Sequence, residues 1–173
     1  MTIKEPPLEA SIEEKIQWAD LVWEAESASL LGDRETASML ERFGGAVIAS
    51  QTEMRLSGAA EICRRCDQEE GGSCCGRGIE DHYSALLLLV NRLLDVRLPQ
   101  SRPDPESCYF LAPDGCMLLA RHVICVNYIC RAITERIDPA RLSAMREKEG
   151  EELTTLFLLA ERVRSALKAG GSP

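Results

Sequence analysis

The sequence lacks a long apolar run. Its longest uninterrupted apolar stretch is Ala85–Val90, six residues in a chain of 173. A membrane-spanning helix needs about 20 such residues, so we expect no transmembrane segment. The N-terminus has no apolar core and is therefore unlike a secretory signal. We predict a cytoplasmic protein, in a compartment that keeps thiols reduced.

Basic blocks and aromatic-rich basic stripes are missing as well. The chain holds 20 Lys and Arg residues against 28 Asp and Glu residues, and only 5% of its residues are aromatic. The excess of acid lies in residues 1–60, which contain 11 acidic and 5 basic side chains. Nucleic acids and anionic membranes attract basic surfaces, so we expect neither as a partner.

No segment of useful length alternates apolar and polar residues, which argues against a β-sheet. Helical signals are present instead. Ser11 stands three residues before Glu14, the spacing of a capping box, and predicts a helix over about 10–31. Asp33 can cap a second helix that continues to residue 62. Residues 10–62 are therefore expected to form an N-terminal helical pair.

The C-terminal part is also predicted to be helical. Asp138 followed by Pro139 matches an N-cap with proline at the first helical position, and apolar residues continue at helical spacing over 138–169. We therefore expect a mainly α fold with one domain over 1–173. Its expected architecture is a small helical bundle with an irregular, loop-rich cysteine cluster, residues 63–131, docked on it.

Within residues 63–131 the signals are mixed. The most apolar helix is expected at about 79–95 and should be central. Four prolines make residues 98–114 an irregular connection. Gly115–Cys116 is predicted to be a tight turn. The stretch 117–131 is ambiguous between strand and helix, and a helix over His122–Arg131 is favoured.

All the cysteines of the chain fall inside this middle segment. They are Cys63, Cys66, Cys74 and Cys75, followed by Cys108, Cys116, Cys125 and Cys130. Clustered thiols indicate either a metal site or a disulfide framework. A chain of this size builds a core without covalent links, so metal is favoured. Thiolates bind zinc, iron–sulfur clusters and Cu(I), and all eight cysteines are candidate ligands.

Other interpretations apply to individual residues. A single cysteine can be a small buried apolar residue. This applies most to Cys130 and to one of Cys74 and Cys75, because adjacent side chains normally point apart. If both of them bind metal, two ions or a polynuclear cluster are favoured. His122 could be a ligand but is more often a packing residue, and His82 is expected at the surface.

Several arginines lie near the thiols in the sequence and could lower thiolate pKa values. They are Arg64, Arg65, Arg77, Arg121 and Arg131.

The pattern C-x2-C…CC, followed by CYFLAPDGC and a further cysteine, resembles the zinc- or iron-chelating cysteine-cluster family. That family typically reads C-x2-C-x2-CC and then C-x-x-L with a Gly-Cys turn. The matching positions are Cys63, Cys66, Cys74, Cys75, Cys108, Leu111, Cys116 and Cys125. The chain departs from the pattern in its longer loop between Cys66 and Cys74, and Arg121–His122 stands where Arg-Pro is typical.

The family is similar to the cysteine-rich part of flagellin lysine methylases. The chain has no long acceptor-binding region like theirs, so their activity does not transfer.

The sequence thus predicts a cysteine-thiolate metal-binding protein that holds an iron–sulfur cluster or zinc, with a structural, redox or sensing role. Two alternatives stay open. One is a protein-modifying, methylase-like enzyme, although no general base accompanies the thiols. The other is a helical interaction module with purely structural cysteines, which would bind a protein partner through its N- and C-terminal helices.

Overall fold

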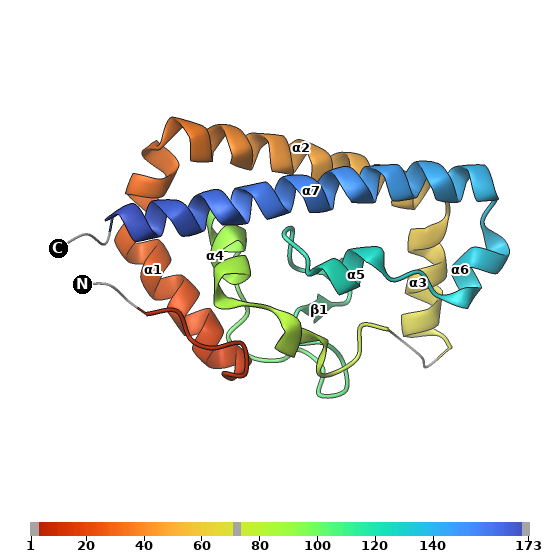
Figure 1. The fold of residues 1–173 in the computed structure, drawn as a ribbon. Helices are drawn as coiled ribbons and strands as arrows, with labels where there is room; N and C mark the ends of the chain where they lie inside the picture. Colours follow the sequence, from red (N-terminus) through yellow and green to blue (C-terminus); the bar gives the residue numbers. More distant parts are fainter. Residues whose placement is uncertain (1–3, 71–73, 171–173) are drawn as a thin grey trace.

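The computed structural model describes residues 4–70 and 74–170 and is mainly helical, as predicted (Figure 1). The α-helices are α1 (Ile12–Gly32), α2 (Arg34–Leu56), α3 (Ala59–Gln68), α4 (Ala85–Leu93), α5 (Val123–Asn127), α6 (Arg131–Arg136) and α7 (Pro139–Gly170). A short 3-10 helix, η1, covers Ile79–His82. The strands β1 (Leu111–Ala112) and β2 (Gly115–Cys116) pair antiparallel in a small hairpin.

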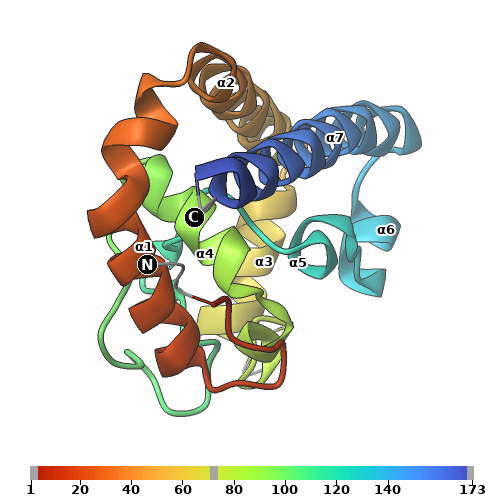
Figure 2. The ribbon, with the colours of Figure 1, turned by 60° about the vertical axis from the view of Figure 1, so that its left-hand side comes forward.

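The two longest helices, α2 and α7, lie side by side and run in opposite directions (Figure 1). Helices α1 and α4 pack together under one end of this pair, and α3 and α6 meet at the other end (Figures 1 and 2). Helix α5 lies between the two ends and contacts α7. The segments that carry the cysteines therefore lie under the α2–α7 pair.

Local caps form where the sequence predicts them. The Ser11 hydroxyl accepts a hydrogen bond from the Glu14 amide at 3.2 Å, and the Glu14 carboxylate accepts one from the Ser11 amide at 2.9 Å. Asp33 accepts from the Thr36 amide at 2.8 Å and begins α2. The same carboxylate receives Arg162 of α7 at 2.7 Å. These contacts connect the α1–α2 corner to the C-terminal helix.

The predicted second helix over residues 33–62 is wrong, because it is two helices. Helix α2 ends at Leu56, and Gly58 has a φ of 86°, in the left-handed region that glycine adopts without steric cost. Helix α3 begins at Ala59. Cys63 and Cys66 consequently lie inside a helix of their own and not at the end of a long one.

The central apolar helix is confirmed but is shorter than predicted. Seven of the nine residues of α4 are buried. The helix starts at Ala85 because the Ser84 hydroxyl caps it, accepting from the Leu87 amide at 3.2 Å. Residues 79–82 form the separate turn η1, and the helix does not extend to residue 95.

Two further predictions need correction. Gly115–Cys116 is a strand and not a tight turn, since it pairs with β1. Each strand of this pair has two residues, so the fold stays mainly helical, as predicted. The predicted helix His122–Arg131 is limited to Val123–Asn127, because His122 caps it and the chain is extended again at Tyr128.

The apolar interior consists of two separate clusters. The main cluster joins α1, α2, α4 and α7, with Phe43, Leu88 and Leu159 fully buried. The smaller cluster contains Ala59 of α3, Ile133 of α6 and Met145 of α7, together with Ile137. Within the described residues, no helix is both long and apolar enough to cross a membrane.

Candidate metal centre

All eight cysteines lie in the described part of the chain, and no disulfide joins any two of them. Their exposure differs. Cys108 is buried, Cys74 and Cys116 are exposed, and the others are half-buried. Each cysteine that the sequence predicts as a metal ligand is therefore a free thiol.

Helix α3 brings two of the thiols together. Cys63 and Cys66 are three residues apart, so both lie on one face of the helix. Cys63 packs on the smaller apolar cluster, and so does Cys130, which is the N-cap residue of α6. Contacts between α3 and α6 therefore place Cys130 near the C-x2-C pair, although it is distant in sequence.

The electrostatic environment adds Cys74 to this set. The pKa of Cys63 is raised to about 11, first by burial and then by the nearby thiols of Cys74, Cys130 and Cys66. The pKa of Cys66 is also raised, first by burial and then by Glu70, Cys130 and Cys74. We call Cys63, Cys66, Cys74 and Cys130 the α3 thiol group.

A second set of thiols is held by backbone pairing. The Cys108 amide donates to the Cys75 carbonyl at 2.8 Å, and the Arg77 amide donates to the Glu106 carbonyl at 3.0 Å. These bonds align residues 75–77 with residues 106–108. The β1–β2 hairpin follows directly and carries Cys116.

Cys125 joins this second set through Tyr83. The buried Tyr83 hydroxyl donates to the Cys125 sulfur at 3.7 Å and accepts from the His122 amide at 3.1 Å. Burial raises the pKa of Tyr83. The hydroxyl therefore stays protonated and can donate the hydrogen bond. Tyr83 thus orients the start of α5 and its thiol.

The shifts in pKa show that the thiols of Cys75, Cys108, Cys116 and Cys125 act on one another. Burial raises the pKa of Cys108 to about 12, with Cys116 and Cys125 among the neighbours that raise it. The pKa of Cys75 is lowered, first by a hydrogen bond from Cys74, while burial and the thiols of Cys116, Cys125 and Cys108 oppose the shift. We call Cys75, Cys108, Cys116 and Cys125 the hairpin thiol group.

The two groups adjoin at the neighbouring residues Cys74 and Cys75. The hydrogen bond between their thiols is the first cause that raises the pKa of Cys74. Cys74 also acts on the pKa of Cys125. Cys74 therefore acts on thiols of both groups.

Arg121 is a cation that acts on the pKa values of two cysteines of the hairpin thiol group, Cys116 and Cys125. Crowding by surrounding protein raises the pKa of Cys116 although the residue is exposed, and Arg121 opposes this rise. It does the same for Cys125. The Arg121 Nε is buried and has no hydrogen-bond partner among the described residues. A buried N–H donor without a partner can serve an anionic acceptor.

Asn91 of α4 holds the segment between Cys116 and Cys125. This fully buried side chain accepts from the Leu119 and Ala120 amides at 2.9 and 3.0 Å and donates to the Ala120 carbonyl at 2.9 Å. The chain thereby runs along α4 towards Arg121. Asn91 is the single polar residue in the apolar sequence of α4 before Arg92, and this exception was a signal that the sequence interpretation did not use.

We expect Asn91→Leu to lower the free energy of unfolding by roughly 2 to 3 kcal/mol, because it leaves buried backbone amides without acceptors. Urea denaturation measures the change. Asn127→Leu is the matched control, since Asn127 is exposed, and it should shift stability by less than about 0.5 kcal/mol. Equal effects of the two substitutions would contradict the anchoring role of Asn91.

The two histidines have local roles. The His122 Nδ1 accepts from the Ile124 amide at 3.2 Å and caps α5. Its ring stacks on exposed His82, with the ring centroids 5.6 Å apart. These contacts agree with the packing interpretation of His122 and the surface interpretation of His82.

Most of the other arginines have acidic partners. Arg64 pairs with Glu61, Arg65 lies near Glu69, and Arg131 pairs with Glu135, all at the surface. Of the five arginines that lie near the thiols in the sequence, Arg121 is the one that lowers the pKa values of Cys116 and Cys125.

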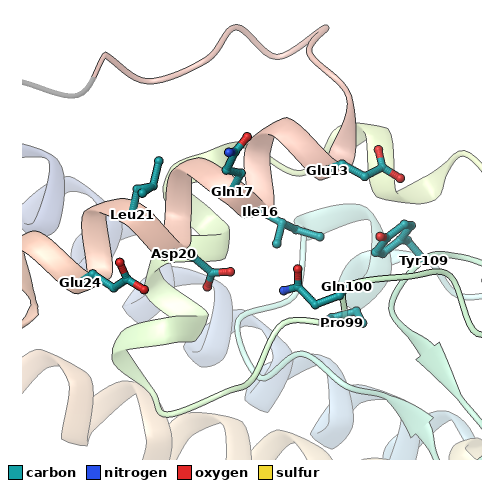
Figure 3. A pocket seen from close by; sticks show the side chains of 9 residues that line it. All are labelled: Glu13, Ile16, Gln17, Asp20, Leu21, Glu24, Pro99, Gln100 and Tyr109. Atoms are coloured by element: carbon teal, nitrogen blue, oxygen red, sulfur yellow. The ribbon is translucent and has the colours of Figure 1, made fainter.

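A cleft of about 360 Å³ lies between α1 and residues 99–109 (Figure 3). Its wall includes the carboxylates of Glu13, Asp20 and Glu24, and Tyr109 stands opposite. None of its lining residues is a cysteine. The cleft therefore does not form part of the thiol centre.

Among residues 4–70 and 74–170, no group of three or more His, Cys, Asp or Glu side chains is placed so that it could hold a metal ion. The chemistry of the donors nevertheless suits a thiophilic metal, because all eight cysteines are free thiols. No family model, no curated protein and no solved structure matches the chain. The resemblance to the cysteine-cluster family therefore rests on the cysteine pattern alone.

Proposed function

We propose that this protein binds metal through its cysteine thiolates, as an iron–sulfur cluster or as zinc, in a structural, electron-transfer or sensing role. One observation carries the proposal: all eight cysteines are free thiols, and five of them lie at the two apolar clusters, Cys63 and Cys130 at the smaller one and Cys75, Cys108 and Cys125 at the main one. Thiolate is the ligand that zinc and iron–sulfur clusters prefer.

The environment of the thiols supports a metal more than it supports redox chemistry of the free thiols. Reactive cysteines have lowered pKa values; the pKa of Cys63 is raised to about 11 and that of Cys108 to about 12, mainly by burial, whereas the pKa of Cys75 is lowered by the hydrogen bond from Cys74. Cys63 and Cys108 are poor nucleophiles until a metal displaces their protons, since metal binding drives deprotonation. A reducing compartment such as the cytoplasm would keep them available.

The alternative of a protein-modifying enzyme gains less support. An enzyme would need a substrate pocket beside the metal, and the cleft lined by Glu13 and Tyr109 contains no thiol. An interaction role for the long helices is compatible with metal binding. Leu21 and Leu31 of α1 and Phe157 and Leu158 of α7 are exposed apolar side chains that a protein partner would cover.

The test is elemental analysis of protein purified without air, together with its visible absorption spectrum. We expect either iron with acid-labile sulfide and a coloured protein, or colourless protein with zinc. Metal should leave on treatment with a chelator, and helix content should fall with it, because metal binding is coupled to folding. Protein that holds no metal, and that folds unchanged when its thiols are replaced, would contradict the proposal.

A further inference from the structure

We propose that the cleft between α1 and residues 99–109 is a binding site for an elongated organic cation, a linear aliphatic polyamine with ammonium groups at its two ends. The proposal goes beyond metal binding, because no cysteine lines the cleft. It also gives a role to the excess of acidic residues in the N-terminal third of the chain.

Three carboxylates line one wall of the cleft in a row along α1. Glu13, Asp20 and Glu24 are spaced by seven and then four positions, so they lie on one face of the helix. Figure 3 shows Glu13 and Glu24 at opposite ends of the row, with Asp20 between them. The rise of an α-helix separates the two ends by about 16 Å along the axis. A ligand that reaches both ends must therefore be long and narrow.

The negative charge of the cleft is available at its two ends. Asp20, in the middle, is paired with Arg92 at 2.8 Å. Within the part of the chain that the structure describes, neither Glu13 nor Glu24 forms an ion pair with a basic side chain. A ligand with a cationic group at each end would complement this distribution of charge.

Tyr109 is an independent observation that indicates a ligand. It is only 2% exposed, yet its hydroxyl forms no hydrogen bond with any described residue. Figure 3 shows the hydroxyl end of the side chain turned towards the cleft. Arg102 stands over the ring but pairs with Glu80. Buried hydroxyls usually have a partner, and the N–H of an ammonium group at the Glu13 end would supply one.

The Tyr109 hydroxyl adds no charge of its own to the cleft. Its pKa is raised, first by burial and then by the carboxylate of Glu13. The hydroxyl therefore stays protonated and neutral, and its oxygen can accept a hydrogen bond from a cation.

The lining favours an organic cation over a metal ion. Ile16, Leu21 and Pro99 contribute apolar surface beside the carboxylates, and Leu21 is 45% exposed. Methylene groups gain free energy by covering such surface, whereas a metal ion with its bound waters does not. Among residues 4–70 and 74–170, no group of three or more candidate ligands is placed to hold a metal ion. The volume of about 360 Å³ is at the lower end of the range for small-molecule sites and suits a slender ligand.

The test uses two diamines of equal charge and different length as probes. Isothermal titration calorimetry of the full chain, at physiological ionic strength, compares diaminobutane with diaminodecane. The longer diamine can approach both Glu13 and Glu24, so it should bind about tenfold more tightly than the shorter one. Magnesium carries the same charge without the chain and should not displace diaminodecane.

Two double variants separate the cleft from other acidic surface. Glu13→Gln/Glu24→Gln should remove the advantage of the longer diamine. Glu26→Gln/Glu41→Gln changes the net charge by the same amount outside the cleft and should leave that advantage in place. Tyr109→Phe should weaken the binding of diaminodecane by about threefold to tenfold, because one hydrogen bond is lost. Circular dichroism shows whether each variant folds.

Equal affinity of the wild-type protein for the two diamines would overturn the proposal. Equal losses of binding in the two double variants would also overturn it, because attraction to the acidic chain as a whole would then explain the binding. A preference for the longer diamine that persists in Glu13→Gln/Glu24→Gln would exclude the cleft as the site. None of these outcomes depends on whether the thiols bind metal.

Discussion

Replacing Glu152 with glutamine is expected to lower the free energy of unfolding by about 3 to 5 kcal/mol, because Arg121 is left as a charge without its partner inside the protein. Glu152 of α7 is fully buried, and both of its carboxylate oxygens lie 3.0 Å from an Arg121 guanidinium nitrogen. Only 13% of the Arg121 side chain is exposed, so water replaces little of the lost interaction. Urea unfolding followed by circular dichroism measures the change.

Glu151→Gln is the matched control, since it makes the same chemical change one residue away. The Glu151 side chain is 51% exposed and pairs with Lys148 at 3.1 Å. Loss of an exposed pair of this kind should cost less than about 1 kcal/mol. Replacing both members of the buried pair, as in Arg121→Met/Glu152→Leu, should recover much of the stability. A Glu152→Gln effect no larger than that of Glu151→Gln would contradict this assignment.

The pair also matters for the thiol centre. Arg121 lies between Cys116 and Cys125 in the sequence, and its ion pair attaches that segment to α7. If the cysteines bind metal as proposed, Glu152→Gln should therefore also weaken metal retention, although it changes no cysteine.

If the cysteines bind metal as proposed, Cys63→Ser combined with Cys66→Ser is expected to lower the metal content and to reduce helix stability. Both side chains lie on one face of α3, and serine is a poor ligand for thiophilic metals. Metal that joins α3 to Cys130 of α6 would contribute binding energy to folding, so its loss should lower the midpoint of thermal unfolding. Metal content and melting temperature, measured on the same preparation, report both effects.

The control is the same double variant compared with wild-type protein after a chelator has stripped both of metal. The difference in melting temperature should then nearly vanish, because serine and cysteine are close in size. A difference that persists would show that the thiols contribute by packing on the smaller apolar cluster. Unchanged metal content in the double variant would show that Cys63 and Cys66 are not ligands.

The helix ends that the sequence predicts correctly are those with local causes. The capping box of Ser11 and Glu14, the cap at Asp33 and the proline at position 139 each act within one helical turn. The buried position of α4 also follows from its composition, since a helix apolar on most faces must be covered.

The errors occur where tertiary packing competes with local pattern. The apolar residues from Leu40 to Ile62 keep a helical spacing, yet Gly58 permits a change of direction that sends α3 down to meet α6. Gly115–Cys116 becomes a strand because residues 111–112 are folded back against it. Neither partner segment can be identified from spacing within the element itself.

The sequence by itself determined the helical class, the main helix starts and the concentration of eight thiols in residues 63–130. Only the tertiary structure decided which thiols are neighbours. Cys130, the least expected ligand, packs on the same apolar cluster as Cys63, and Cys75 pairs through its backbone with Cys108. The physical reason is that spacing along the chain controls neighbours within one helical turn or hairpin. The position of Cys130 depends instead on how α6 packs against α3, and that of Cys75 on its pairing with Cys108.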